Sequence, residues 1–162
     1  MKSLIAAATG LLLITAAASA AEKTPSTEDF AKTVAVSDLF EIEAGKLAQE
    51  KGTAAQKDFG AMMVKDHTKT SSELKELVST GKVKAELPTS LDKAHQTKLD
   101  NLKKESGKEF AAAYKSSQVE AHKDAISLFE RYSKDGDNSD LKSWTGKTLP
   151  ALQHHAELAN KL

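Results

Sequence analysis

The chain has 162 residues, with 23 Lys and Arg against 23 Asp and Glu, five His and no Cys. The even charge balance disfavours a nucleic-acid-binding protein and a polybasic membrane-surface protein, because both carry a basic surplus. Without Cys there is no disulfide, thiolate metal ligand, Cys nucleophile or lipidated Cys. The length is that of one ordinary domain.

Residues 1–20 have the pattern of a secretory signal peptide. A positive start at Lys2 precedes an apolar run over residues 4–17, and Ala18-Ser19-Ala20 supplies the small side chains that a signal peptidase accepts. We therefore predict cleavage after Ala20, export to a bacterial periplasm, and a slightly acidic mature chain, because cleavage removes Lys2 and no acid. No later apolar stretch approaches the roughly 18 residues that span a bilayer. After cleavage we expect no transmembrane segment, and at most a peripheral association with the envelope.

Beyond this segment the sequence predicts helices separated by short turn signals. Residues 21–27 form a polar linker, and Ser or Thr residues before several helical stretches can cap them. Gly52 and Gly81 mark the ends of the first two long stretches. The predicted helices span residues 28–51, 54–80, 90–105, 108–134 and 139–162. The last of these contains Pro150, where a kink is expected.

The four longer helices repeat inward-facing positions at intervals of three and four residues, with no competing β-alternation. Such spacing keeps one face of each helix against partner helices. The predicted fold class is all-α, an antiparallel four-helix bundle formed as a single domain over residues 28–162. The shorter helix belongs in the connection between the second and third long helices. An apolar face that the bundle leaves unpaired could form the interface of a homodimer.

On each long helix the inward-facing residues form an apolar stripe, which one ionisable residue interrupts. Burial of such a residue requires a partner. One such residue per long helix suggests that the four face one another across the interior. Imidazole and carboxylate are ligands of zinc, iron, copper and nickel, so these residues are candidate metal ligands. The candidates are Glu41, His67, His122 and His155. Carboxylates that could orient the imidazoles are Glu43, Asp66 and Asp124.

The stripe of the second helix admits two interpretations, because Asp66 fits it nearly as well as His67. Two functional alternatives to metal or small-ligand binding also remain. The Glu and His residues could form a buried hydrogen-bond network in a non-catalytic envelope or stress protein. They could also form a non-standard site of a metal-dependent redox enzyme. His95 and His154 are expected at the surface.

Several observations make an enzyme the less favoured interpretation. Ferritin-like di-metal sites use a Glu-x-x-His motif, and the residues three before the stripe histidines are Val64, Val119 and Leu152. A di-iron oxidase is therefore disfavoured. The sequence also lacks a nucleophile motif, a Walker-type loop and a dinucleotide fingerprint.

Five blocks of sequence stand out along the mature chain. They are FEIEAGKLA (40–48), MVKDHTK (63–69), LDKAHQ (91–96), FAAAY (110–114) and TLPALQHH (148–155). Together they resemble the family known as domain of unknown function 4142. The resemblance implies a ferritin-like helical bundle, exported by bacteria and often described as an outer-membrane or membrane protein. It also implies that the family pattern includes Glu41, Glu43, Asp66, His67, His122 and His155. The chain departs from that pattern at Ala121, where the family often has Asp.

Overall fold

Five helices account for most of residues 23–162, the part of the chain that this computed structural model describes. They are α1 (Thr27–Lys51), α2 (Ala54–Ser79), α3 (Lys93–Lys104), α4 (Gly107–Asp135) and α5 (Ser139–Ala159). This range contains no strand, so the predicted all-α class is confirmed for it. The predicted signal peptide and its cleavage site lie outside the described residues and stay predictions.

Side-chain caps fix where four of the five described helices begin. The Ser26 hydroxyl accepts a hydrogen bond from the backbone N–H of Asp29, so α1 begins at Thr27, one residue earlier than predicted. Thr53 and Gln56 form a reciprocal capping box at the start of α2. The short helix α3 begins at Lys93 rather than at residue 90, because its cap is the Asp92 carboxylate. At the other end of the chain, α5 stops at Ala159 and does not continue to residue 162.

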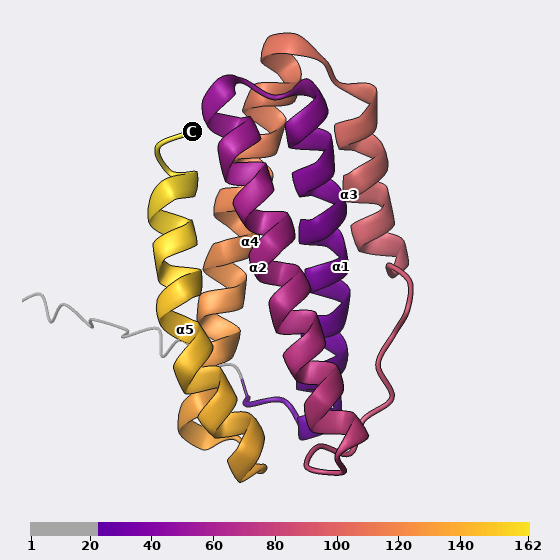
Figure 1. Cartoon of the computed structure of the whole chain (residues 1–162), viewed down its shortest axis with the longest axis vertical. Coiled ribbons are helices and arrows are strands. Elements are labelled where there is room, and N and C mark those ends of the chain that lie inside the picture. The colour runs from indigo at the N-terminus through magenta and orange to yellow at the C-terminus, as the bar shows by residue number, and fades with distance from the viewer. Residues whose placement is uncertain (1–22) are drawn as a thin grey trace, which may run out of the picture.

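The four long helices lie side by side along the long axis of the molecule, and α3 lies outside α1 (Figure 1). Short turns join α1 to α2 and α4 to α5, so each of these pairs is antiparallel. Residues 80–106, which include α3, carry the chain back along the molecule before α4 begins (Figure 1). This long connection makes α4 antiparallel to α1 and α5 antiparallel to α2, which are the remaining contacts between long helices.

A glycine contact sets the register between α1 and α2. A Cβ atom added to Gly60 would lie 2.6 Å from the carbonyl oxygen of Gly45, and one added to Gly45 would lie 2.7 Å from that of Gly60. Only glycine permits this approach of two backbones. Asp38 precedes Gly45 by seven residues and His67 follows Gly60 by seven, about two turns in each antiparallel helix. The glycine contact therefore places Asp38 opposite His67.

The interior consists of two apolar clusters with polar residues between them along every long helix. One, the N-terminal cluster, is centred on Phe30, Leu74, Phe129, Tyr132, Leu141 and Trp144. The other, the C-terminal cluster, is centred on Phe40, Phe59, Met63, Phe110, Tyr114 and Ala159. The residues buried between them are Asp38, Glu41, His67, Gln118, His122 and His155, and we call these six the polar layer.

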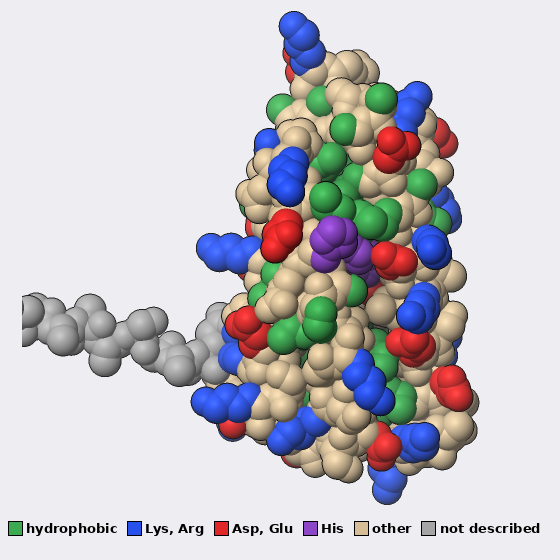
Figure 2. Space-filling view, turned by 60° about the vertical axis from the view of Figure 1, so that its left-hand side comes forward, with side chains coloured by type: hydrophobic (Ala, Val, Ile, Leu, Met, Phe, Trp, Pro, Cys, Tyr) green, Lys and Arg blue, Asp and Glu red, His purple; other side chains and the backbone are tan. Residues whose placement is uncertain are grey.

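The surface carries charged side chains of both signs. On the face in Figure 2 they are interspersed, and histidine side chains lie near mid-height beside a group of hydrophobic ones. Among helices α1 to α5, none is long and apolar enough to cross a membrane. The expectation of no transmembrane segment is therefore consistent with the described helices.

Candidate metal centre

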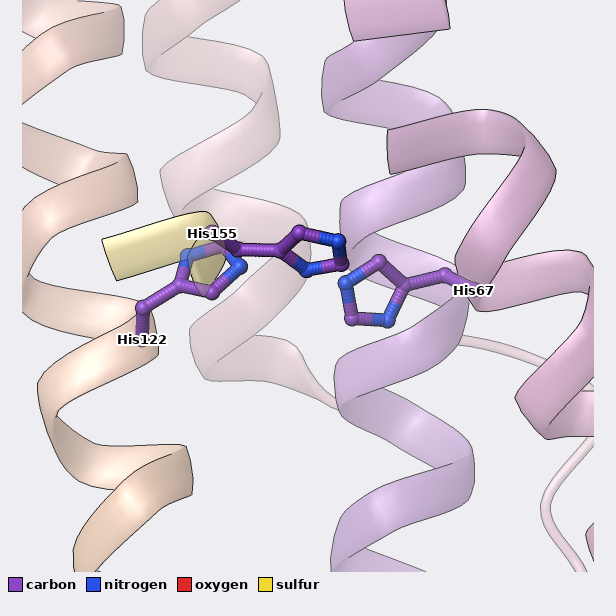
Figure 3. Close-up of side chains that lie close together, drawn as sticks. All are labelled: His67, His122 and His155. Atoms are coloured by element: carbon purple, nitrogen blue, oxygen red, sulfur yellow. The ribbon is translucent and has the colours of Figure 1, made fainter. Parts of the chain in front are cut away.

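Three histidines from three helices meet inside the polar layer. His67 lies on α2, His122 on α4 and His155 on α5, and their exposed fractions are 5%, 1% and 3%. Their rings point toward one another (Figure 3), with centroids separated by 5.4 to 6.0 Å. One ligand atom from each lies within 4.8 Å of the other two. We call this group the histidine centre.

One nitrogen of each ring is engaged by a fixed acceptor. Nδ1 of His122 lies 2.9 Å from the backbone carbonyl oxygen of Gln118. Nδ1 of His67 lies 2.8 Å from Oδ1 of Asp38. Nε2 of His155 lies 3.1 Å from Oδ2 of Asp66. A carbonyl or carboxylate oxygen can only accept, so each of these nitrogens carries the proton.

When a ring is neutral, its second nitrogen therefore presents a lone pair. These atoms are Nε2 of His67, Nε2 of His122 and Nδ1 of His155. All three are buried and have no hydrogen-bond partner among the described residues. Leaving a buried polar atom without a partner typically costs about 1–3 kcal/mol. Three such atoms on rings that face one another are the arrangement of ligands around a metal ion.

The geometry fits a first-row divalent ion after small adjustments. Zn²⁺ holds imidazole nitrogens at about 2.1 Å, so two ligands in a tetrahedral site lie about 3.4 Å apart. The atoms of the histidine centre are within 4.8 Å of one another. Ring rotations that move each nitrogen by about 1 Å close this gap. The hydrogen bonds at the opposite nitrogens orient the rings, as acceptors behind ligating histidines do in metalloproteins.

The electrostatic surroundings keep two of the imidazoles neutral. Burial lowers the pKa of His122 to about 3, and repulsion from the other two histidines contributes to the shift. Burial also lowers the pKa of His155, although its hydrogen bond to Asp66 opposes the change. Burial alone would lower the pKa of His67, but the hydrogen bond and attraction to Asp38 raise it overall. A metal ion binding here would therefore displace a proton mainly from His67.

Glu41 lies in the polar layer but outside the compact group of three histidines. Its Oε2 atom accepts a hydrogen bond of 2.7 Å from Nε2 of Gln118, and its Oε1 atom is buried without a partner. Burial raises the pKa of Glu41, and attraction to His67 partly opposes the rise. The Tyr114 hydroxyl nearby is also buried without a partner among the described groups.

The structure places the other predicted carboxylates differently. Asp66 is half-buried at the edge of the layer and binds His155 rather than its neighbour His67, which is the inward residue of the two. Asp124 is exposed, and the acceptor at Nδ1 of His122 is a backbone carbonyl. Glu43 is half-exposed and pairs with Lys46 at 2.6 Å, away from the histidine centre.

Two residues of the layer were not among the predicted site residues. Asp38 accepts hydrogen bonds from His67 and from the hydroxyls of Thr70 and Ser71. Its signal in the sequence is its position three residues before Glu41, which keeps it on the inward face of α1. Gln118 holds His122 through its backbone carbonyl, and no sequence pattern marks a carbonyl for such a role.

The fold and the site together define a class: an all-helical protein with a buried centre of three histidines. Comparison with protein families then identifies the family, because the one described as "Domain of unknown function (DUF4142)" matches residues 13–162. The chain belongs to this family, and the resemblance inferred from its sequence blocks is confirmed. No curated protein and no solved structure matches the chain.

Proposed function

We propose that this chain is an exported protein that binds one divalent transition-metal ion through His67, His122 and His155. Its fold would be an antiparallel four-helix bundle of the ferritin-like kind. The observation that carries the proposal is the set of three buried lone pairs on rings that face one another. Zinc, iron, copper and nickel all accept imidazole ligands, and the absence of Cys excludes thiolate ligands.

A metal ion accounts for features that a purely structural network does not. The Asp38 carboxylate, with its three donors from α2, does act as a structural hydrogen-bond acceptor between two helices. That network, however, uses only one nitrogen of His67 and leaves the facing nitrogens of all three rings unpaired. A protein under selection for stability alone gains more from apolar side chains at such positions.

Glu41 supports the metal site without belonging to its compact group. A divalent ion with three neutral imidazoles keeps its full charge, and a buried charge needs compensation. The carboxyl group of Glu41 is buried and interacts electrostatically with His67, so its ionisation on metal binding would supply a compensating charge. We assign Glu41 to charge balance, and the carboxylates of Asp38 and Asp66 to ring orientation.

Export to the periplasm rests on the signal pattern of residues 1–20 and on the family resemblance. A His and carboxylate centre suits an oxidising compartment, since it has no thiolate to be oxidised. The proposal does not include catalysis. A redox enzyme would use the same histidine centre and would be recognised by turnover of oxygen or peroxide.

Metal analysis of the purified protein tests the proposal. The chain is expressed with its own leader in a bacterial host and recovered from the periplasm, and the bound metal is measured by mass spectrometry. We expect about one equivalent per chain. Saturation at one hundred times the dissociation constant should also stabilise the fold by about 2.7 kcal/mol, measured as a shift in thermal unfolding.

A double variant and a matched control decide the outcome. His67→Ala with His122→Ala should lose both the metal and the thermal shift. His154→Ala should keep both, because His154 is exposed beside His155 in the chain. Absence of any bound metal, together with no thermal shift from zinc, cobalt, nickel or copper, would overturn the proposal in favour of a structural network.

A further inference from the structure

A cleft of about 450 Å³ lies between α1 and α4 and reaches His67 of the histidine centre. His67 and Asp38, both buried, line it at the polar layer. Lys98 of α3 and Asp124 of α4 are lining residues that are exposed to solvent. The cleft therefore connects the surface beside α3 with one histidine of the centre.

The cleft lies between two long helices that are joined less tightly than the pairs connected by short turns. Short turns hold α1 against α2 and α4 against α5, and contact is far more extensive within these pairs than between α1 and α4. Small side chains on the facing walls add space. Ser37 on α1 faces the cleft, as do Ala121 and Ala125 on α4.

We infer that this cleft admits a small anionic ligand, of the carboxylate class, to an open coordination position of the metal ion. The inference rests on the proposed metal function. Three protein ligands leave the fourth position of a tetrahedral site available, which is the arrangement of reactive rather than structural centres. Because the imidazoles are neutral ligands, the ion retains positive charge and favours an anion at that position.

The lining of the cleft narrows the ligand class. Its volume lies in the range of sites for small molecules, at about 300–1,000 Å³. Val34, Leu128 and Phe129 offer an apolar wall, while Ser37 offers a hydroxyl group. A short-chain carboxylate satisfies both, with its carboxylate on the metal and its alkyl chain along the wall. An anion without an apolar part would contact the metal ion but not the apolar wall.

Cobalt(II) gives a direct spectroscopic test, since its visible bands report the ligands around the ion. The purified protein is loaded with cobalt(II) and titrated first with azide and then with butyrate. We expect saturable changes of the visible bands with both. Ala125→Leu, which fills the cleft, should keep cobalt binding and weaken butyrate binding about tenfold or more, equivalent to about 1.4 kcal/mol.

Two further variants make the result specific to the cleft. Ser37→Leu blocks it from the opposite wall and should act like Ala125→Leu, so the test does not depend on one variant folding. Ala151→Leu changes an exposed position of α5 and should bind butyrate as the unmodified protein does. Cobalt binding is recorded before any anion is added, which separates this inference from the metal function.

Each outcome has a distinct meaning. Failure to bind cobalt overturns the metal function and this inference with it. Stoichiometric cobalt with bands that neither anion changes overturns the open position alone. Equal butyrate binding in the unmodified protein and in both blocking variants overturns the cleft as the route. A response to azide without one to butyrate overturns the carboxylate class.

Discussion

The polar layer and the two apolar clusters on either side of it are built from the same four helices, yet they are stabilised differently. The clusters are held by close packing of aromatic and aliphatic side chains, as in the contact of Phe30 with Tyr132, whose ring centroids are 4.2 Å apart. The layer is held by directed hydrogen bonds and keeps several buried atoms unpaired. Packing alone does not require such a layer, and its unpaired ring nitrogens are the basis of the proposed metal function.

Removal of a large side chain from an apolar cluster should have the largest effect on stability. Phe110 is fully buried in the C-terminal cluster, so Phe110→Ala should lower the free energy of unfolding by about 3–5 kcal/mol through lost burial and a residual cavity. Urea denaturation measures the change. Metal affinity of the folded protein should be unaffected, because Phe110 is not part of the polar layer.

Phe30→Ala in the N-terminal cluster is the matched control, since Phe30 is also fully buried. The two variants should lose similar stability and keep similar metal affinity. A loss of metal affinity in either folded variant would contradict the separation between clusters and layer.

Within the layer, the acceptor behind His67 should matter for both stability and metal binding. Asp38→Ala leaves His67 and the Ser71 hydroxyl without their acceptor, and leaves the Thr70 hydroxyl only the carbonyl oxygen of His67. We expect a loss of about 2–3 kcal/mol, because buried donors lose their partner. Metal affinity measured by calorimetry should fall by about 10- to 100-fold, because the ring loses its orientation.

The matched variant Asp38→Asn keeps an acceptor oxygen and nearly the same shape. It should restore part of the stability and part of the metal affinity, since an amide oxygen accepts a weaker hydrogen bond from His67 than a carboxylate oxygen does. Equal metal affinity in Asp38→Ala and the unmodified protein would remove Asp38 from the site.

The low pKa of His122 predicts a loss of stability in acid for the metal-free protein. Its pKa is about 3 in the fold against 6.5 ordinarily, so the unfolded chain binds more protons between these values and the free energy of unfolding falls as pH falls. At pH 5 the effect is on the order of 2 kcal/mol. His122→Phe should remove it, so the unmodified protein should lose more stability than the variant between pH 8 and pH 5.

Other titratable groups of the polar layer change how the free energy of unfolding depends on pH in both proteins, but not the difference between the unmodified protein and His122→Phe. His155 has a lowered pKa and acts in the same direction as His122. His67 and Glu41 have raised pKa values, so the folded state holds their protons and they favour folding at lower pH. Parallel urea titrations after chelation measure the difference, and identical pH profiles for the two proteins would refute the assignment to His122.

Removal of the hydroxyl group from either of two buried tyrosines should have the smallest effect on stability, and the two effects should have opposite signs. The hydroxyl of Tyr114 has no partner among the described residues, so Tyr114→Phe should change the free energy of unfolding by less than about 1 kcal/mol, toward greater stability. The hydroxyl of Tyr132 bonds to Thr27 and to Asp137, so Tyr132→Phe should cost about 1 kcal/mol. Thermal unfolding of both variants measures the opposite signs.

Much of the candidate site could be predicted because helix periodicity assigns residues to faces. The stripes that contain His67, His122 and His155 follow intervals of three and four, and the structure buries all three. The same intervals did not separate Asp38 from its neighbour Ser37, because adjacent positions differ by only about 100° around a helix. The carbonyl of Gln118 and the exposed position of Asp124 depend on side-chain and backbone geometry that periodicity does not describe.

By itself the sequence determined the helices and the faces on which the histidines lie, because these properties depend on neighbours within a few residues. The tertiary structure decided which of those faces meet and at what height. Gly45 and Gly60 set the register of α1 against α2, and the long connection through α3 sets the direction of α4. Contacts between residues far apart in the chain thus bring the imidazoles of three helices together and leave a cleft beside one of them.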